Sequence, residues 1–436
     1  MPPFFWTQKQ DVGPSGRTSH ALAFDAAHKT VVLFGGDPGG SPLGDTWTWD
    51  GSLWTQVGDT GPDARHRSAA AFDAARGQVV LFGGAAGQGL FGDTWTWDGE
   101  LWTQVADTGP AARAGHAVAY DAARQQVVLF GGRTGAGLVA DTWAWDGSEW
   151  TQVQDAGPSA RQGHAMADEP ATGKVLLFGG AGGSGAGLDD TWAWDGLGWA
   201  QAADTGPDER VHTAMITTGT VVVLFGGVNS IDPLLSPADR VLYRDSWRWD
   251  GKAWTQVQDI GPGPRWGHGI AFRTDVSRIL LFGGSSVLAP AEDSLLIPGL
   301  QHDTWEHSGP TSQPDDGQPN GGDPNAGPVA VASVTATPDT VSNQGDTMVV
   351  VATLTGPAPV DGVQLTIGVF VDTGGGGFMP VDPPGFIVPL TMGVDGGGIS
   401  AQFTMVRDAT PLAPGGYAVG VGVDAGQMQG ALFTIT

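Results

Sequence analysis

Six arginines that recur at nearly constant spacing are the residues of this chain best suited to hold an anion. Each opens an Arg-x-x-His or similar segment, and in five copies a histidine follows two or three residues later. Guanidinium groups gathered in a ring would bind a carboxylate or an acidic sugar. The members of this candidate site are Arg17, Arg65, Arg113, Arg161, Arg210 and Arg265, followed by His20, His116, His164, His212 and His268.

The same regularity supports a structural interpretation of these arginines. An aspartate lies just upstream of each one, and a residue present in every repeat usually serves packing between repeats. We therefore favour an Arg–Asp ion pair that stabilises the preceding turn. The aspartates are Asp11, Asp59, Asp107, Asp155, Asp204 and Asp259.

Tryptophans offer a second candidate chemistry, the stacking of indoles on sugar rings. Most of them recur at equivalent positions, which indicates core packing instead. Trp266 is the exception, because the other copies hold different residues there, and it is a candidate ligand platform. The recurring set is Trp47, Trp95, Trp143, Trp192, Trp247 and Trp305, and the counterparts of Trp266 are Thr18, His66, Ala114, Gln162 and Val211.

Two long segments break the repeat. After the Gly-Gly pair, the first four copies have eight or nine residues before the aspartate of the third strand-like run, whereas the fifth has seventeen (228–244) and the sixth eighteen (285–302). Long loops on a compact scaffold are often functional. The candidate contact residues on these loops are therefore Arg240, Tyr243, Arg244 and His302. The alternative is that the insertions only cover the last two repeats.

The elements that position these residues form a repeat of about 48 residues. Its Gly-Gly pairs begin at Gly35, Gly83, Gly131, Gly179, Gly226 and Gly283. In the second copy, Ala69–Phe72, Val79–Phe82, Asp93–Trp97 and Leu101–Val105 are strand-like, and Asp98-Gly99 is a hairpin turn. Such a period with four short strands predicts an all-β, six-bladed β-propeller. The arginines would then lie near the mouth of its central channel.

The ends of the repeat region predict how this ring closes. The sixth copy stops after its third strand, whereas Trp6-Thr7-Gln8 matches the fourth strand of the other copies, such as Trp54-Thr55-Gln56. We expect the N-terminal strand to complete the last blade.

These motifs resemble kelch repeats, and residues 4–307 are similar in style to the Trp-Asp-Gly-rich kelch proteins of bacteria and to the central domain of galactose oxidase. The resemblance implies a propeller. Galactose oxidase chemistry needs a cysteine crosslinked to tyrosine, and this chain has no cysteine and only Tyr120, Tyr243 and Tyr417. Copper-radical catalysis is therefore excluded. Sialic acid epimerases are also six-bladed kelch proteins, which leaves an enzyme acting on a small anion as an alternative.

Composition changes abruptly after residue 308. Residues 309–328 are rich in Pro, Gly, Asp and Asn and predict a flexible linker. Residues 329–436 contain seven apolar or alternating runs separated by turn residues, which predicts an immunoglobulin-like β-sandwich. This part resembles the Ig-like modules of bacterial surface proteins.

Bulk properties restrict the function further. With 46 acidic and 20 basic residues the net charge is −26, which argues against nucleic acid as a partner. No transmembrane segment, signal peptide, metal motif or cofactor motif is recognisable. Acidity and the Ig-like module suggest a secreted or cell-surface protein.

The expected function is a non-catalytic binding module. A monomeric propeller would use its loop face to bind a protein or a carbohydrate. The alternative is an enzyme at the channel mouth that acts on an acidic sugar or another small anion.

Overall fold

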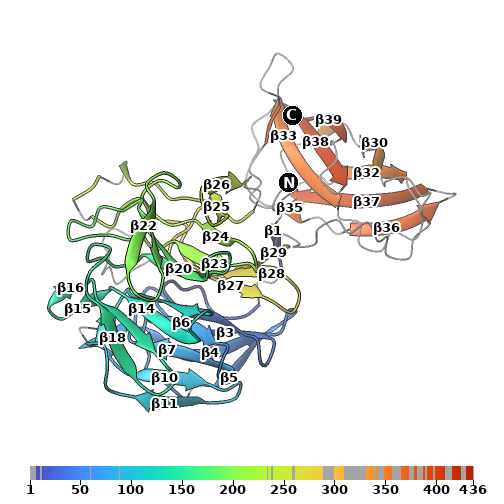
Figure 1. Cartoon of the computed structure of the whole chain (residues 1–436). Helices are drawn as coiled ribbons and strands as arrows, with labels where there is room; N and C mark the ends of the chain where they lie inside the picture. The colour runs from blue at the N-terminus through green and yellow to red at the C-terminus, as the bar shows by residue number, and fades with distance from the viewer. Residues whose placement is uncertain are drawn as a thin grey trace. The chain divides into compact units, whose positions relative to one another are not determined.

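The computed structural model describes residues 6–308, apart from residues 10–11, 59, 88, 233, 237–238, 258–260 and 288–298, and the strand backbones between residues 330 and 435. The regular elements in these ranges are β-strands, and no α-helix occurs among them. Two compact units are distinguished, Phe4–Gln313 and Pro314–Thr436 with Met1–Pro3. Figure 1 shows both units, which are described separately here.

One sheet illustrates how the repeat folds. β6 (Ala69–Asp73), β7 (Gln78–Phe82), β10 (Thr94–Trp97) and β11 (Trp102–Ala106) form an antiparallel meander in the order β11-β10-β7-β6. β7 is apolar on both faces because both faces are covered by other sheets. Its residues Val79 and Leu81 pack against the preceding sheet, and Val80 and Phe82 against the following one.

Five further four-stranded antiparallel sheets are built in the same way in the described part of the chain. The first contains β2 (Ala21–Asp25), β3 (Thr30–Gly36), β4 (Leu43–Trp49) and β5 (Trp54–Gly58); the third β13 (Ala117–Asp121), β14 (Gln126–Phe130), β17 (Thr142–Trp145) and β18 (Trp150–Gln154); the fourth β19 (Ala165–Glu169), β20 (Lys174–Phe178), β21 (Thr191–Trp194) and β22 (Trp199–Ala203); the fifth β23 (Ala214–Thr217), β24 (Val222–Phe225), β25 (Ser246–Trp249) and β26 (Trp254–Val257); the sixth β27 (Gly269–Arg273), β28 (Arg278–Phe282), β29 (Thr304–Ser308) and β1 (Trp6–Gln8).

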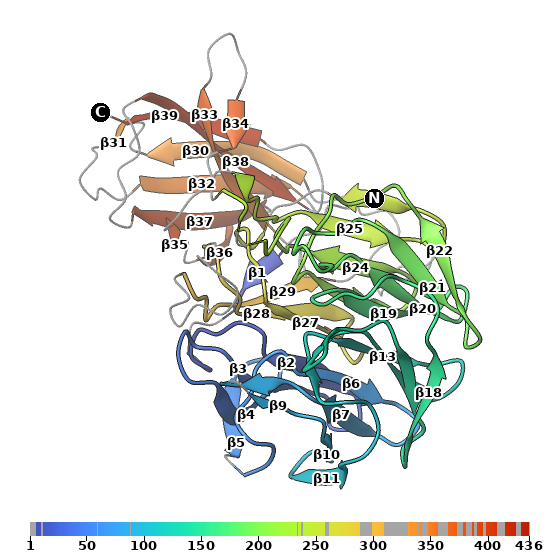
Figure 2. The ribbon, with the colours of Figure 1, turned by 90° about the vertical axis from the view of Figure 1, so that its left-hand side faces the viewer.

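The innermost strands of these sheets contact one another in a closed cycle. β2 contacts β6, and the succession continues through β13, β19, β23 and β27 back to β2. Figure 2 shows several of these inner strands side by side. The first and last sheets are therefore neighbours.

The last sheet is completed by the N-terminus, as the sequence predicts. β1 pairs antiparallel with β29, with Trp6 opposite His307 and Gln8 opposite Trp305. Lys9 adds an ion pair with Glu306, whose carboxylate is buried and lies 3.3 Å away. The sheet thus joins the two ends of the repeat region without a covalent turn.

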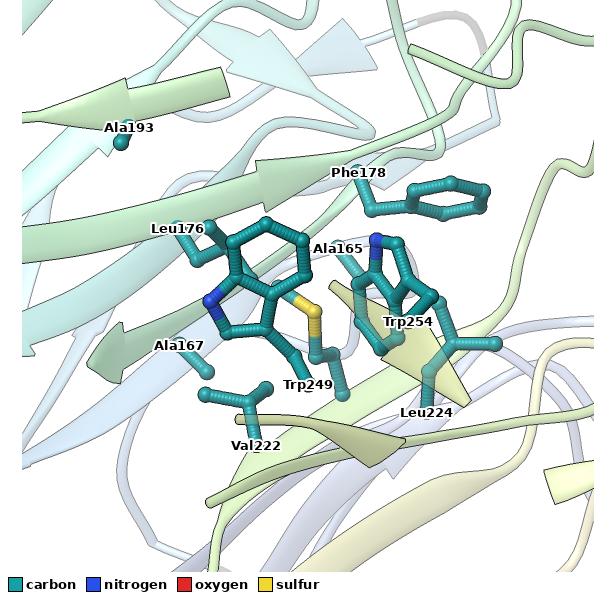
Figure 3. Packing of buried hydrophobic residues seen from close by; sticks show 10 residues of the cluster. Ala165, Ala167, Leu176, Phe178, Ala193, Val222, Leu224, Trp249 and Trp254 are labelled. Atoms are coloured by element: carbon teal, nitrogen blue, oxygen red, sulfur yellow. The ribbon is translucent and has the colours of Figure 1, made fainter. Parts of the chain in front are cut away.

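Tryptophans from one sheet pack against the apolar strands of its neighbour. In the cluster of Figure 3, Trp249 and Trp254 lie beside Leu176 and Phe178 of the fourth sheet. The Trp254 Nε1–H also donates to the Thr191 hydroxyl, 2.9 Å away on that sheet. Equivalent indole–hydroxyl bonds join other neighbouring sheets: Trp54 with Thr304, Trp102 with Thr46, Trp150 with Thr94 and Trp199 with Thr142.

The recurring tryptophans predicted as core are only half-buried. They pack at the margins of the apolar clusters, and each indole N–H donates to the aspartate two residues earlier, as Trp143 does to Asp141 at 2.7 Å. The deepest indoles lie two positions later, at Trp49, Trp97, Trp145 and Trp194. Residues two positions apart lie on the same face of a strand, so the alternation of side chains does not show which set of tryptophans is more deeply buried.

Small hairpins follow the Gly-Gly pairs. They include β8 (Ala85–Ala86) with β9 (Gly89–Leu90), and β15 (Arg133–Thr134) with β16 (Gly137–Leu138). β15 also pairs with β12 (Arg113–Ala114). The loops after Gly-Gly and the arginine segments therefore lie on one face of the sheets, as expected; we call this the upper face.

The second unit is also built of strands. One sheet has the order β30-β32-β37-β35 with β36 on β37, and the other the order β31-β39-β38-β33-β34. The predicted strands coincide with long members of both sheets, whereas the immunoglobulin-like assignment stays a prediction. The strands are β30 (Ala330–Thr337), β31 (Thr340–Val341), β32 (Met348–Thr355), β33 (Leu365–Asp372), β34 (Phe378–Pro380), β35 (Phe386–Ile387), β36 (Leu390–Asp395), β37 (Gly398–Arg407), β38 (Gly415–Val423) and β39 (Gln429–Ile435). The predicted linker, residues 309–328, lies outside the described residues.

Candidate functional site

The six recurring arginines are buried and paired with aspartates. Arg113 makes a two-pronged contact with Asp141, with Nη1–Oδ1 and Nη2–Oδ2 distances of 2.7 and 2.8 Å. Its Nη1 also donates to the Gly131 carbonyl, and its Nε to that of Ala111. The same arrangement joins Arg17 to Asp45, Arg65 to Asp93, Arg161 to Asp190, Arg210 to Asp245 and Arg265 to Asp303.

The predicted partner of these arginines is wrong. The bridging aspartate begins the third strand of the same repeat and is not the aspartate upstream of the arginine. Burial alone would raise the pKa of Asp141, but the hydrogen bonds from Arg113 and Trp143 and the Arg113 charge lower it. Each arginine therefore binds the end of the second strand to the start of the third, and its donors point at protein oxygens. This geometry favours the structural interpretation over a ring of anion-binding cations.

Four of the histidines also serve packing between sheets. The ring of His116 meets that of Phe82 edge-on, with centroids 5.4 Å apart, and His20, His164 and His268 contact a phenylalanine in the same way. Burial, and then the charge of the nearby arginine, lowers the pKa of His116 to about 3. These imidazoles are therefore neutral near pH 7.

His212 does not belong to this series. His116 lies three residues after its arginine, and the residue at that place in the fifth repeat is Thr213. His212 lies only two residues after Arg210. The ring of His212 instead contacts Trp266, with centroids 5.6 Å apart. Counting from the arginine separates the two positions, because His212 stands at the place of Gly115 and Gly163, one residue before the place of His116.

A closed ring of backbone hydrogen bonds unites the six repeats on the upper face. One residue of each sheet, two positions after the recurring arginine, donates its N–H to the carbonyl of the equivalent residue in the preceding sheet, over 2.7 to 3.0 Å. We call this the hydrogen-bonded ring; it contains Ser19, Arg67, Gly115, Gly163, His212 and Gly267. Apart from the glycines in three of the six copies, no residue pattern at this position predicts the ring.

Trp266 is buried, so the prediction of an exposed ligand platform is wrong. Only 7% of its surface is accessible. It packs with Ala181, Val211 and Val228, and its Nε1–H donates to the Val287 carbonyl over 3.0 Å. Val287 belongs to segment 285–302, which is longer than the corresponding segment of the first four repeats. This long segment therefore supplies one hydrogen-bond partner of the buried indole.

The other candidate contact residues lie on the two long segments. Arg240 Nη2 donates to the Asp232 carbonyl over 2.7 Å, and the Tyr243 ring covers the Arg210 guanidinium, 4.0 Å from its centroid. Arg244 and His302 are exposed. Burial, followed by the Glu209 charge, raises the pKa of Tyr243 to about 12. Most of segment 285–302 lies outside the described residues.

Three exposed aliphatic side chains lie on the described parts of these same segments, a feature the sequence analysis missed. Leu234 is 92% exposed, Val241 47% and Val287 44%. We call Leu234, Val241 and Val287 the aliphatic ridge. Exposed apolar side chains on a loop face are candidates for contact with a partner.

Two negative findings apply to the described part of the chain. No group of three or more His, Cys, Asp or Glu side chains there has an arrangement that could hold a metal ion. Nor does any helix in it have the length and apolar character needed to cross a membrane.

Comparisons with known proteins agree with this architecture. Residues 99–284 match the model of the KLHDC2/KLHL20/DRC7 Kelch-repeats domain. Among solved structures, "Structure of YjhT" matches with a TM-score of 0.51 and 16% identity, covering 67% of this chain and 95% of that one. At this identity the likeness concerns the fold alone. No curated protein matches the sequence. The chain therefore contains a kelch-repeat region, folded into small antiparallel sheets as in a kelch-type propeller.

Proposed function

We propose that this protein is a non-catalytic binding module in which a six-bladed kelch propeller carries a partner-binding upper face. In this proposal the six sheets are the complete set of blades, and residues 329–436 form an Ig-like spacer after the linker. The aliphatic ridge carries the proposal, because it is the asymmetric feature of an otherwise repeated face. Kelch repeats are in general protein-interaction domains, which supports it.

The ridge is held in place by its own segment. The Asn229 N–H donates to the Val241 carbonyl over 3.0 Å, and the Asn229 side chain accepts the Val241 N–H over 2.8 Å. The Ser230 hydroxyl donates to the Gly185 carbonyl of the neighbouring sheet. A segment ordered before binding loses less conformational entropy when a partner docks.

The chemistry of the ridge favours a protein over a carbohydrate. Sugar rings are bound chiefly by stacking on exposed aromatic faces. Here Trp266 is covered and Tyr243 lies over Arg210, whereas the exposed side chains are aliphatic. Arg244, exposed on the same segment as Leu234 and Val241, adds a residue type favoured at protein interfaces.

The enzyme alternative has less support in the described residues. An active site is expected to gather titratable groups that are perturbed and available to substrate. The six recurring arginines are instead ion-paired, and the four packed histidines are buried against phenylalanine rings. A sialic acid epimerase-like activity therefore remains the second proposal, without a residue constellation that favours it.

The experiment compares Leu234→Ser with Leu101→Ser as bait. Leu101 is 61% exposed on an outer hairpin, so both changes remove one exposed leucine and neither alters a core. Proteins captured from the native host by the unchanged protein should be retained by Leu101→Ser and lost with Leu234→Ser. Equal capture by both variants would place the contact surface away from the ridge.

A loop replacement tests the whole surface. The eight-residue segment 85–92 can replace segment 228–244, because its Phe91 covers Arg65 as Tyr243 covers Arg210. We expect the chimera to fold and to lose the partner, as judged by its thermal unfolding midpoint and by direct binding. A folded chimera with full affinity would contradict the proposal.

A further inference from the structure

The sheet that closes the repeat region differs from the other five at the deepest aromatic position of its third strand. The other sheets have a tryptophan there, and the sixth has His307, which is 1% exposed. Each of the five indoles packs against the tryptophan that begins the fourth strand of its sheet, as Trp49 does against Trp54 with centroids 5.6 Å apart. The five tryptophans are Trp49, Trp97, Trp145, Trp194 and Trp249. The last sheet therefore replaces a pair of tryptophans by a tryptophan and a histidine.

This histidine contacts the strand that the N-terminus contributes. Trp6 lies opposite His307 in the register of β1 and β29, and their rings meet edge-on with centroids 5.2 Å apart. The Lys9 N–H donates to the Thr304 carbonyl over 2.7 Å. In the other sheets a hairpin turn such as Asp98-Gly99 joins the third and fourth strands, and no such turn joins β29 to β1. β1 can therefore separate from β29 without unfolding a hairpin.

Cations surround the carboxylate next to His307. Glu306 is buried and forms ion pairs with one residue from each of three strands, over 3.0 to 3.4 Å. These residues are Lys9 near β1, Arg273 of β27 and Arg278 of β28. Asp275, in the turn after β27, pairs with Arg273. The last sheet thus has three cations around one carboxylate, and a charge on His307 would add a fourth.

The other groups packed around this pair are apolar. Ile279 of β28 lies opposite His307, and Phe225 of the fifth sheet packs against Trp6. Burial lowers the pKa of His307 to about 3, from the ordinary value of 6.5. Because the pKa is depressed in the closed sheet, the contribution of the neutral imidazole to closure is complete above pH 6.5 and is lost as the pH falls towards 3.

We propose that the contact between Trp6 and His307 makes closure of the last sheet acid-sensitive, so that protonation of His307 releases β1 while the other five sheets stay folded. The remaining buried histidines respond differently. His116 and its equivalents pack against phenylalanines between whole sheets, so water reaches them only when two sheets separate. This inference goes beyond the proposed function, because the aliphatic ridge takes no part in it.

The test follows hydrogen exchange of the β1 amides in the full chain. The Lys9 N–H exchanges when β1 separates from β29, and mass spectrometry of a peptide containing residues 6–9 measures this after correction for the intrinsic effect of pH. His307→Phe keeps an aromatic side chain that cannot be protonated. His307→Gln provides the same test with a polar side chain if the phenylalanine variant does not fold. His116→Gln is the matched control, because His116 is also buried but packs between the second and third sheets.

Between pH 7.5 and pH 5.5, the corrected exchange rate of β1 should rise about tenfold in the unchanged protein. This is the effect of one imidazole with a pKa of about 3 in the closed sheet and 6.5 in the open one. The rise should persist in His116→Gln and disappear in both His307 variants. The proposal is overturned if the unchanged protein shows no rise, if the rise persists without His307, or if His116→Gln abolishes it. Capture of a partner is a separate measurement, so this failure and that of the proposed function are distinguishable.

Discussion

Asp168 is the residue that departs most from its repeat in the inner strands. Four other inner strands have an aromatic ring at this position, namely Phe24, Phe72, Tyr120 and Phe272. Burial raises the pKa of Asp168 to about 6, and the charges of Asp121 and Glu169 add to the rise against one hydrogen bond from the Ala122 N–H. The ionised carboxylate is therefore a destabilising group in the folded protein.

We expect Asp168→Asn to stabilise the protein near neutral pH. Because the folded pKa lies above the unfolded one, the contribution of Asp168 to stability is greatest below pH 3.8 and is lost as the pH rises through 6. At pH 7.5 the substitution should raise the free energy of unfolding by roughly 2 kcal/mol, and at pH 4 by almost nothing. Urea unfolding followed by tryptophan fluorescence measures this, since all the tryptophans precede residue 306.

Asp141→Asn is the control of opposite sign. The pKa of Asp141 is lowered in the folded protein, and the substitution leaves the buried Arg113 without its counter-charge. It should destabilise the protein at pH 7.5. Destabilisation by both variants would show that the Asp168 carboxylate is stabilising after all.

The role of a residue could be predicted from the sequence only where a single residue was available as its bonding or packing partner. Two aspartates recur with every arginine, and spacing cannot tell that the one beginning the third strand is the bonded one. Likewise, Trp266 is buried by residues distant in the sequence, among them Ala181 and Val211, which no local pattern points to. The positive φ angles of Ser19, Arg67 and His212 were not predictable, because residue types other than glycine do not indicate such a backbone conformation.

At the scale of elements, the sequence predicted far more. Apolar runs such as Val79–Phe82 end at Gly-Gly pairs, so the strands of each sheet could be placed to within a few residues. The small hairpins of the upper face were missed, because each of their strands has only two residues and such a short strand shows no periodic pattern of apolar residues. Trp6 was placed correctly because its neighbours repeat those of Trp54.

The N-terminal strand should be necessary for the stability of the sheets. Trp6 packs near Phe225 and His307, with centroid distances of 5.6 and 5.2 Å, so it joins the fifth and sixth sheets. Trp6→Ala should lower the free energy of unfolding by about 3 kcal/mol. Deletion of residues 1–12 should cost more, because it also exposes the edge of β29.

Urea unfolding again provides the measurement, and Thr7→Ala the control, since Thr7 is exposed on the same strand. An unchanged unfolding midpoint after the deletion would show that closure does not depend on β1.

At the scale of the whole molecule, the two units should fold independently. The predicted linker contains few apolar residues, and the boundary between the units falls within it, after Gln313. A fragment of residues 329–436 should give a β-type circular dichroism spectrum and a cooperative thermal transition. A disordered fragment would mean that the domain boundary or the sandwich assignment is incorrect.

The closure of the last sheet by β1 has a consequence for synthesis on the ribosome. β1 is translated before the other strands of the repeat region, but its partner β29 begins only at Thr304. At roughly 5–20 residues per second, the nascent strand waits about 15–60 s for that partner. During this interval the earlier sheets can stack in succession while the ring is still open. The earliest strand of the repeat region to be synthesised is thus among the last to pair with its partner.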